Sequence, residues 1–294
     1  MSDRPILFLV FNRPEHTQRV FDRIREVKPK RLFVAADGPR RSRAGETDRC
    51  ENTRAIATRI DWECELKTLF REENLGCGKA VSSAIDWFFS EVEDGIILED
   101  DCLPRDSFFS FCDQMLEFYR ADASIMHIGG SNFQNGSIRG DGSYYFSRLS
   151  HVWGWATWKD RWQKYDYSLH KYRDYPLKSL NKELLNLLKW VKSKHANTWD
   201  VQWLFSVWFN NGISVTPNVS LIENIGFDGG ATHTRGVPPW YRKMIYGEIC
   251  DLKHPTSKLV DGFADELVFK THFRFNPIME RFKAVFRHFK HVLR

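Results

Sequence analysis

Three consecutive acidic residues, Glu99, Asp100 and Asp101, follow the apolar run Ile96–Leu98 near the middle of the chain. An unbroken apolar run is typical of a strand buried on both faces of a parallel sheet, which places the acids at the carboxyl end of that strand. Ligands of open α/β sheets bind at this edge, and carboxylate oxygens suit a hard divalent cation such as Mg²⁺ or Mn²⁺. For the triplet taken alone, the preferred interpretation is a solvated loop that leads into the next helix, with Asp106 as its cap.

A second stretch of interest is Glu73–Lys79, in which two glycines and a lysine precede an expected helix at Ala80–Phe89. A helix N-terminus favours anions, so the stretch is a candidate phosphate loop. Its spacing is neither that of a Walker loop nor GxGxxG, and an ordinary turn before a helix explains it equally well. Both interpretations remain open at this point.

The elements that must position these residues alternate along the first half of the chain. Apolar runs predict strands, and apolar stripes at helical spacing predict the helices between them. The expected strands are Pro5–Phe11, Arg31–Ala36, Glu65–Phe70, Ile96–Leu98 and Ile125–Ile128, and the expected helices are Glu15–Val27, Ala80–Phe89 and Phe108–Tyr119. Such alternation predicts a doubly wound, mostly parallel α/β sheet with right-handed connections.

The second half of the chain is rich in tryptophan and tyrosine, whose faces pack against a protein core or against the C–H faces of sugars. One turn and helix is expected to hold Trp153, Trp155, Trp158 and Trp162. Further expected elements are helices at Leu180–Lys194 and Val201–Asn210 and short strands at Ile213–Val215 and Val219–Ile222. The glycine-rich segment Asn224–Gly236 is a candidate mobile lid.

The composition narrows the class of protein. With 294 residues, of which 42% are hydrophobic, the chain can bury a sizeable core. The formal charge of +5 is spread widely and does not indicate a nucleic-acid-binding surface. No N-terminal apolar run approaches the roughly 20 residues that span a bilayer, and the six cysteines show no CxxC spacing. These features predict a cytoplasmic protein with reduced thiols.

Residues 276–294 form an expected basic amphipathic helix at the C-terminus. Such a helix either lies on an anionic membrane surface, giving peripheral contact with the inner face of the membrane, or packs on the core or a partner subunit. The sequence leaves both possibilities open.

Several motifs occur in one order and at compatible spacing over residues 5–235. They are the apolar strand before Glu99–Asp101, the pair Gly154-Trp155 that enters an aromatic helix, and Trp199-Asp200 ahead of Trp203. In this order the chain resembles the nucleotide-sugar glycosyltransferases of the GT-A fold, and among them enzymes similar to N-acetylglucosaminyltransferase I. The resemblance reverses the preference stated for the acidic triplet alone.

The resemblance implies an α/β architecture of the GT-A, Rossmann-like type, with a mostly parallel sheet flanked by helices and a smaller aromatic-rich acceptor half. One domain would cover residues 1–275, with a nucleotide-sugar half at 1–135 and an acceptor half at 136–275. The C-terminal helix at 276–294 would follow it.

The resemblance also implies a role for each matched residue. Asp101 would ligate the metal that bridges the donor's diphosphate, and Asp200 would act as the catalytic base. The other implied donor contacts are Asp100 at the ribose, Glu99 at the sugar hydroxyls, Arg13 and Asp37 at the nucleotide, Lys79 at the diphosphate and His233 in the donor-closing loop. The expected acceptor contacts are Trp155 and Trp199.

The expected function is the metal-dependent, inverting transfer of a hexosyl or N-acetylhexosaminyl group from a UDP-sugar or related donor to a glycan or lipid-linked acceptor. The expected cofactor is Mn²⁺ or Mg²⁺, which neutralises the leaving diphosphate, while a separate carboxylate takes the acceptor's proton. The expected setting is the assembly of surface polysaccharide or lipopolysaccharide. The membrane anchor and stem of the eukaryotic enzymes are not found in this sequence, so their Golgi role and acceptor do not carry over.

The sequence leaves two alternative functions open. A sugar nucleotidyltransferase normally needs a glycine-rich, basic loop after its first strand, where this chain has Asn12-Arg13-Pro14. A non-catalytic carbohydrate-binding protein built on the aromatic residues would bind glycan without metal or nucleotide. Calorimetry with UDP and Mn²⁺ separates this last possibility from the enzymes.

Overall fold

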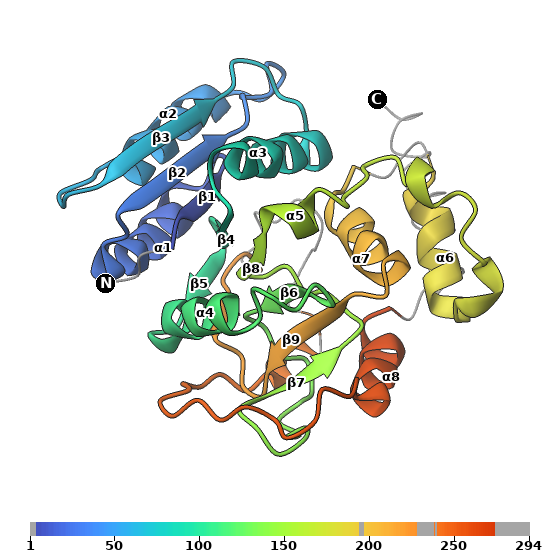
Figure 1. Cartoon of the computed structure of the whole chain (residues 1–294). Helices are drawn as coiled ribbons and strands as arrows, with labels where there is room; N and C mark the ends of the chain where they lie inside the picture. The colour runs from blue at the N-terminus through green and yellow to red at the C-terminus, as the bar shows by residue number, and fades with distance from the viewer. Residues whose placement is uncertain (1–3, 194–196, 228–237, 239, 274–294) are drawn as a thin grey trace.

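The central element is a single eight-stranded sheet to which both halves of the sequence contribute. The computed structural model describes residues 4–193, 197–227, 238 and 240–273 (Figure 1). The strand order is β3-β2-β1-β4-β8-β6-β9-β7. The bounds are β1 Ile6–Val10, β2 Arg31–Ala36, β3 Glu65–Phe70, β4 Asp94–Glu99, β6 Ile125–Gly129, β7 Tyr144–Ser147, β8 Trp155–Trp158 and β9 Ile213–Pro217. Only β8 and β7 run against the other strands of this sheet, so the expected mostly parallel α/β architecture is confirmed.

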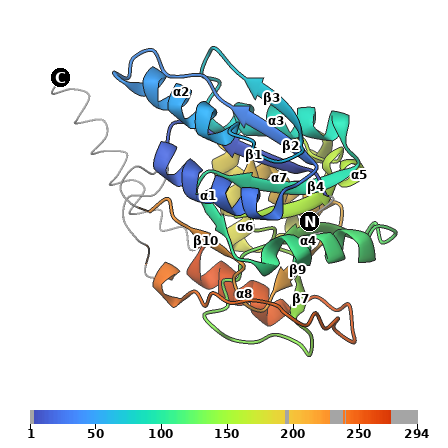
Figure 2. The same cartoon turned by 90° about the vertical axis from the view of Figure 1, so that its left-hand side faces the viewer.

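Helices cover both faces of the sheet, as Figures 1 and 2 show from two sides. On one face lie α1 Pro14–Val27, α2 Glu46–Ala57 and α4 Ser107–Phe118, and on the other lie α3 Cys77–Glu91, α5 Lys159–Trp162 and α7 Asp200–Phe209. Each face has its own apolar core, because successive side chains of the strands point to opposite faces of the sheet. A third apolar cluster joins α7 to α6 Lys182–Val191 and α8 Gly262–Thr271.

The remaining elements are short. A two-stranded antiparallel ladder pairs β5 with β10, and three 3₁₀ turns follow α5, precede α6 and precede α8. Their bounds are β5 Cys102–Pro104, β10 Ile222–Asn224, η1 His170–Tyr172, η2 Leu177–Ser179 and η3 Tyr241–Lys243. The ladder ties the segment after β9 to the residues that directly follow the acidic triplet.

Helix α1 shows how the local sequence sets an element and its neighbours. Pro14 occupies its first turn, where the missing N–H costs nothing, and Val20, Phe21 and Ile24 face the sheet and are buried. Lys28 ends the helix in the left-handed region, with φ of 48°. Because α1 begins immediately after β1, Arg13 is held at the carboxyl edge of the sheet.

The aromatic helix predicted at Gly154-Trp155 is wrong, because Trp155–Trp158 forms strand β8 between β4 and β6. All four of its residues are buried, since the strand is covered on both faces, so it shows none of the alternation that marks a surface strand. The prediction is right only for the short helix α5, which begins at Lys159. Strand β7 was not expected, and the strand expected at Val219–Ile222 is displaced to Ile222–Asn224.

Asp106 precedes α4, as predicted, but its side chain makes no capping hydrogen bond. Its carboxylate instead pairs with Arg23 of α1. The N-terminus of α4 is satisfied from elsewhere in the chain, because Glu248 accepts from the backbone N–H and the hydroxyl of Ser107 at 2.8 and 2.6 Å.

Some expectations concern parts of the chain outside the described residues. The C-terminal helix at 276–294, His233 and the lid beyond Phe227 belong to this group. Within the described ranges, none of the helices has the length and apolar character needed to cross a membrane.

Candidate functional site

The sheet brings three of the predicted segments to one edge. Strands β1, β2 and β4 are parallel neighbours, with Leu9 beside Glu99 and Val10 beside Ala36. The residues that follow these strands therefore meet at the carboxyl edge, where α/β proteins bind ligands. They include Arg13 and Asp37 as well as the acidic triplet.

Arg13 is the cation at the centre of this edge. Its Nη1 lies 2.9 Å from Asp101 Oδ2 and 3.5 Å from Asp100 Oδ1. Asp100 also accepts a hydrogen bond of 3.3 Å from the backbone N–H of Phe11, and only 7% of its surface is exposed. In contrast, within the described part of the chain no hydrogen bond or ion pair reaches the Glu99 carboxylate.

The crowding of acids changes their protonation. Burial, reinforced by Asp101, raises the pKa of Asp100 to about 7. Burial and the negative charges of Asp101 and Asp100 raise the pKa of Glu99 well above its ordinary value. Burial lowers the pKa of Arg13, but the fields of Asp100 and Asp101 outweigh it, so that this pKa is raised. The site therefore favours ligands that bring positive charge or hydrogen-bond donors.

Asp200 enters the same site from the first turn of α7. Trp199 rather than Asp200 occupies the position before the helix, and neither side chain caps it. The hydroxyl of Thr198 donates to Asp200 Oδ1, which orients the carboxylate. Asp200 lies close enough to Glu99 to raise the pKa of that residue. The alternative role of Asp200 as a helix cap is thus not what its geometry shows.

Cys77 lies among these acids and was not expected there. It is the first residue of α3, and burial followed by the charges of Glu99 and Asp200 raises its thiol pKa. The thiol is therefore neutral and a poor nucleophile. In the sequence, the place of Cys77 at this site was indicated only by its position at the start of the helix after Gly76.

Asp37 organises the loop between β3 and α3. Its Oδ1 accepts from the backbone N–H groups of Gly38 and Leu75, both at 2.9 Å. Its Oδ2 accepts from the backbone N–H of Gly76 and from Asn74 Nδ2, both at 3.0 Å. All four contacts come from the protein, so in this structure Asp37 holds the loop in place.

The same contacts bear on the candidate phosphate loop at Glu73–Lys79. The N–H groups of Leu75 and Gly76 point at Asp37, and that of Gly78 donates to Asn197 Oδ1 at 2.9 Å. These donors are therefore already used and do not form a cradle for phosphate. Lys79 is exposed in the first turn of α3, and its side chain makes no hydrogen bond or ion pair with the described residues.

The side chains at this edge could bind a divalent cation through a single carboxylate. Across the described ranges, no three His, Cys, Asp or Glu side chains converge as a ready-made metal site. Asp101 is more accessible than Asp100, with 19% against 10% of its side chain exposed. Its Oδ2 faces Arg13 and the backbone of Gly226, where a Cβ would lie 2.4 Å from that oxygen. A cation here would take one carboxylate ligand from the chain and the rest from substrate phosphates and water, which is the usual pattern for Mg²⁺.

The segment after β10 closes against Asp101. The backbone N–H of Ile225 donates to the carbonyl oxygen of Asp101 at 2.8 Å, and His16 contacts the carbonyl oxygen of Ile225 at 3.0 Å. Tyr241 Oη donates to the carbonyl oxygen of Asn224 at 2.6 Å. The start of the segment predicted to be a lid is thus fastened to the acidic site.

Trp155 and Trp199, the expected acceptor contacts, are packed inside the molecule, with 0% and 2% of their surface exposed. Their rings stack on each other with centroids 5.7 Å apart, and Tyr165 Oη donates to the carbonyl oxygen of Trp199. Neither ring presents a face to a ligand in this structure. Their visible role is to support the first turn of α7.

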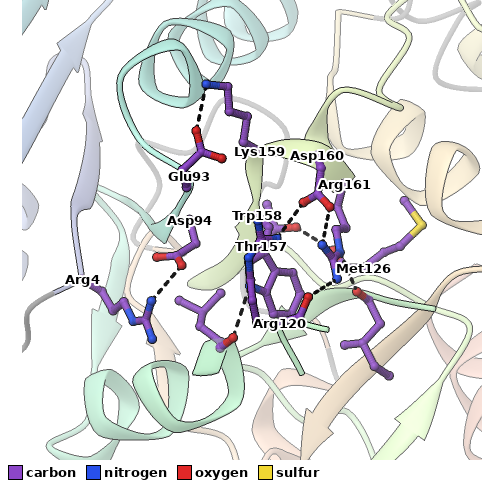
Figure 3. A network of polar contacts seen from close by, with 12 residues as sticks. Arg4, Glu93, Asp94, Arg120, Met126, Thr157, Trp158, Lys159, Asp160 and Arg161 are labelled. Carbon is purple, nitrogen blue, oxygen red and sulfur yellow. Dashed lines mark hydrogen bonds and ion pairs between the residues drawn. The ribbon is translucent and has the colours of Figure 1, made fainter. Parts of the chain in front are cut away.

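The opposite, amino edge of the sheet carries a different set of charges (Figure 3). Arg4 Nη1 lies 2.7 Å from Asp94 Oδ2, and Lys159 Nζ lies 3.1 Å from Glu93 Oε1. A hollow of about 530 Å³ opens beside Arg4 and Asp94, at the start of β1 and β4. Because these acids have cationic partners, the edge has the character of a structural ion-pair network.

Comparisons with known proteins give fold-level likeness only. No family model and no curated protein matches the chain. Among solved structures, apo UDP-glucose pyrophosphorylase is 11% identical with a TM-score of 0.39, covering 73% of this chain and 90% of that one. The inositol-1-phosphate CTP transferase from T. maritima is 10% identical with a TM-score of 0.36, covering 67% and 99%. HddC from Yersinia pseudotuberculosis is 12% identical with a TM-score of 0.30, covering 53% and 77%. Likeness at this level carries no argument about the reaction.

Proposed function

We propose that the chain is a metal-dependent, inverting glycosyltransferase that moves a hexosyl or N-acetylhexosaminyl group from a nucleoside-diphosphate donor, with UDP as the expected nucleotide. The observation that supports it most is the meeting of Asp200 with the triplet Glu99–Asp101 at one sheet edge. The two parts come from separate elements, since Glu99 is the last residue of β4 and Asp200 the first residue of α7, and the charge of Asp200 acts on Glu99.

The arrangement suits an inverting displacement. The acceptor hydroxyl forms a bond to the anomeric carbon as the bond from that carbon to the diphosphate oxygen breaks, and the electron pair leaves with the nucleoside diphosphate. Asp200, whose second oxygen has no hydrogen-bond partner among the described residues, takes the hydroxyl proton. A divalent cation held at Asp101 would supply Lewis-acid stabilisation of the leaving diphosphate.

The other donor contacts are proposed from the positions of the residues. Glu99 has its carboxylate oxygens available for the hydroxyls of the donor sugar, and Asp100 lies beside it for the ribose. Arg13 adds positive charge next to the diphosphate site. Asp37 remains a proposed contact of the nucleotide, and Lys79 a proposed contact of the diphosphate. Asp37 also holds the loop that leads to Lys79.

A sugar nucleotidyltransferase is the second candidate. The names of the similar structures, a UDP-glucose pyrophosphorylase and an inositol-1-phosphate CTP transferase, are nearer to this activity than to glycosyl transfer. The connection between β1 and α1 argues against it, because β1 ends at Val10 and α1 begins at Pro14. The residues between them, Phe11, Asn12 and Arg13, are too few to wrap a triphosphate.

One experiment separates the two candidates. The protein is incubated with Mn²⁺ and either a panel of UDP-sugars or UTP with a panel of sugar 1-phosphates, and the products are separated by ion-exchange chromatography. Release of UDP from a UDP-sugar, faster with an added glycan acceptor, is the expected result. Release of pyrophosphate from UTP without any UDP release would overturn the proposal in favour of the second candidate.

A further inference from the structure

Four partly buried aromatic side chains form a cluster beside the acidic site. This aromatic platform consists of Trp153, Phe227, Trp240 and Tyr241. The ring centroids of Phe227 and Tyr241 are 4.6 Å apart, and the ring of Trp153 lies 5.8 Å from those of Phe227 and Trp240. Unlike the buried Trp155 and Trp199, all four residues are partly exposed, although Trp153, Trp240 and Tyr241 also pack against the third apolar cluster.

The platform is assembled from three segments that the fold fastens to the triplet. The last pair of the antiparallel β4–β8 ladder joins Ile97 to Trp155, and two residues beyond it lie Glu99 and Trp153. Phe227 directly follows Gly226, whose backbone abuts Asp101.

Tyr241 is the third point of attachment. It is bonded to Asn224, which pairs with Cys102 in the β10–β5 ladder, one residue from Asp101. The position of the platform is therefore set by the same backbone that carries the acids.

The platform lies on the side of the triplet away from the proposed nucleotide contacts. In the sheet order β2-β1-β4-β8, Asp37 follows β2 on one side of β4, and Trp153 precedes β8 on the other. A nucleotide held between Asp37 and Asp101 would lie on the other side of β4 from Trp153. A second substrate is thus the natural occupant of the surface.

The chemistry of the surface fits a sugar ring. Partly exposed aromatic faces mark ligand-binding surfaces when they are contiguous and rimmed by polar groups. Here Glu223, Arg19 and Asp101 are close enough to act electrostatically on the Tyr241 hydroxyl. A pyranose offers an apolar C–H face to aromatic rings and hydroxyls to such a rim, whereas an acyl chain offers the rim no hydrogen-bonding group.

We propose that Trp153, Phe227, Trp240 and Tyr241 form a subsite that binds a pyranose ring of an acceptor glycan. The identification of this sugar as an acceptor rests on the proposed function. The binding surface itself is defined by the four rings.

The test is ligand-observed saturation-transfer NMR with methyl glucoside, galactoside, mannoside and N-acetylglucosaminide as probes. The variants are Trp240→Ala and Phe227→Ala, with Trp240→Phe as a conservative substitution that keeps a ring. The matched control is Phe263→Ala on α8, whose side chain is 78% exposed and makes no ring contact among the described residues. Thermal unfolding monitors the fold of each variant.

At least one pyranoside is expected to bind the wild type and Phe263→Ala alike, with the strongest transfer to protons of one C–H face. Each alanine variant is expected to bind it about three- to tenfold more weakly, and Trp240→Phe is expected to retain part of the affinity. Absence of binding to the wild type, or equal binding by folded Trp240→Ala and Phe227→Ala, would overturn the proposal.

A parallel titration with UDP and Mn²⁺ separates this proposal from the proposed function. The platform variants are expected to bind the nucleotide like the wild type. A wild type that binds the pyranoside through the platform but does not bind UDP would contradict the proposed function and support the sugar-binding surface.

Discussion

The two edges of the central sheet both carry charged side chains, but they differ in how the charges are matched. At the amino edge, Asp94 and Glu93 each have a cationic neighbour within about the length of a hydrogen bond. At the carboxyl edge, Asp100 and Asp101 share one cation, Arg13. Among the described residues, Glu99 has no such partner and Asp200 accepts a hydrogen bond only from the hydroxyl of Thr198.

This difference indicates that one edge contributes to stability and that the other carries the groups that bind ligands. Paired surface charges add a modest amount of stability and ask for no ligand. A group of acids that raise one another's pKa destabilises the folded chain unless a ligand binds to the group. The carboxyl edge therefore has the character of a binding site, and the amino edge that of a framework.

The largest expected effect is that of Asp200→Asn at the carboxyl edge. Loss of the proton acceptor should reduce sugar transfer by about 100- to 10,000-fold, the range expected of general-base catalysis. Thr198 can still donate to the amide oxygen, so the local geometry is kept. Steady-state transfer rates and UDP affinity are measured on the same protein, and near wild-type transfer would exclude Asp200 as the base.

A second change tests the close approach of backbone to Asp101. In Gly226→Ala, the new methyl group would lie 2.4 Å from Asp101 Oδ2, so the carboxylate or the chain must shift. UDP affinity in the presence of Mn²⁺ should fall by roughly tenfold, as for a misplaced ligand of the cation.

Gly262→Ala on α8 is the matched control for this change. A Cβ at Gly262 meets nothing within 4 Å, so the control should bind UDP like the wild type. Equal affinity in the two alanine variants would remove Asp101 from the nucleotide site.

The smallest expected effect is at the amino edge. Lys159→Ala removes the partner of Glu93, whose side chain is 69% exposed. The free energy of unfolding, measured by urea titration, should fall by less than about 1 kcal/mol, with transfer unchanged. A large loss of transfer would contradict the division of roles between the two edges.

The sequence predicted the frame well because the frame depends on local pattern. Continuous apolar runs gave strands such as Arg31–Ala36 at their observed bounds, and the acids after Leu98 could be placed at a sheet edge from chain direction alone. The strand Trp155–Trp158 was mistaken for part of a helix, because a run of four buried residues has no period that separates the two structures.

The features of the site that could not be predicted from the sequence depend on tertiary contacts. Asp37 was expected to face a nucleotide, and nothing in its neighbourhood indicated that Leu75 and Gly76 would donate to it. The aromatic platform joins Trp153 to Phe227 and Trp240, which are far apart in the chain. The buried and the exposed tryptophans could not be told apart by residue type.

The most direct test of the account is calorimetric titration with UDP in the presence and absence of Mn²⁺. The chains compared are the wild type, Asp101→Asn at the carboxyl edge and Asp94→Asn at the amino edge. We expect Mn²⁺-dependent binding of UDP to the wild type and to Asp94→Asn, and loss of the Mn²⁺-dependent part in Asp101→Asn. Binding that is unchanged in Asp101→Asn, or lost in a folded Asp94→Asn, would contradict it.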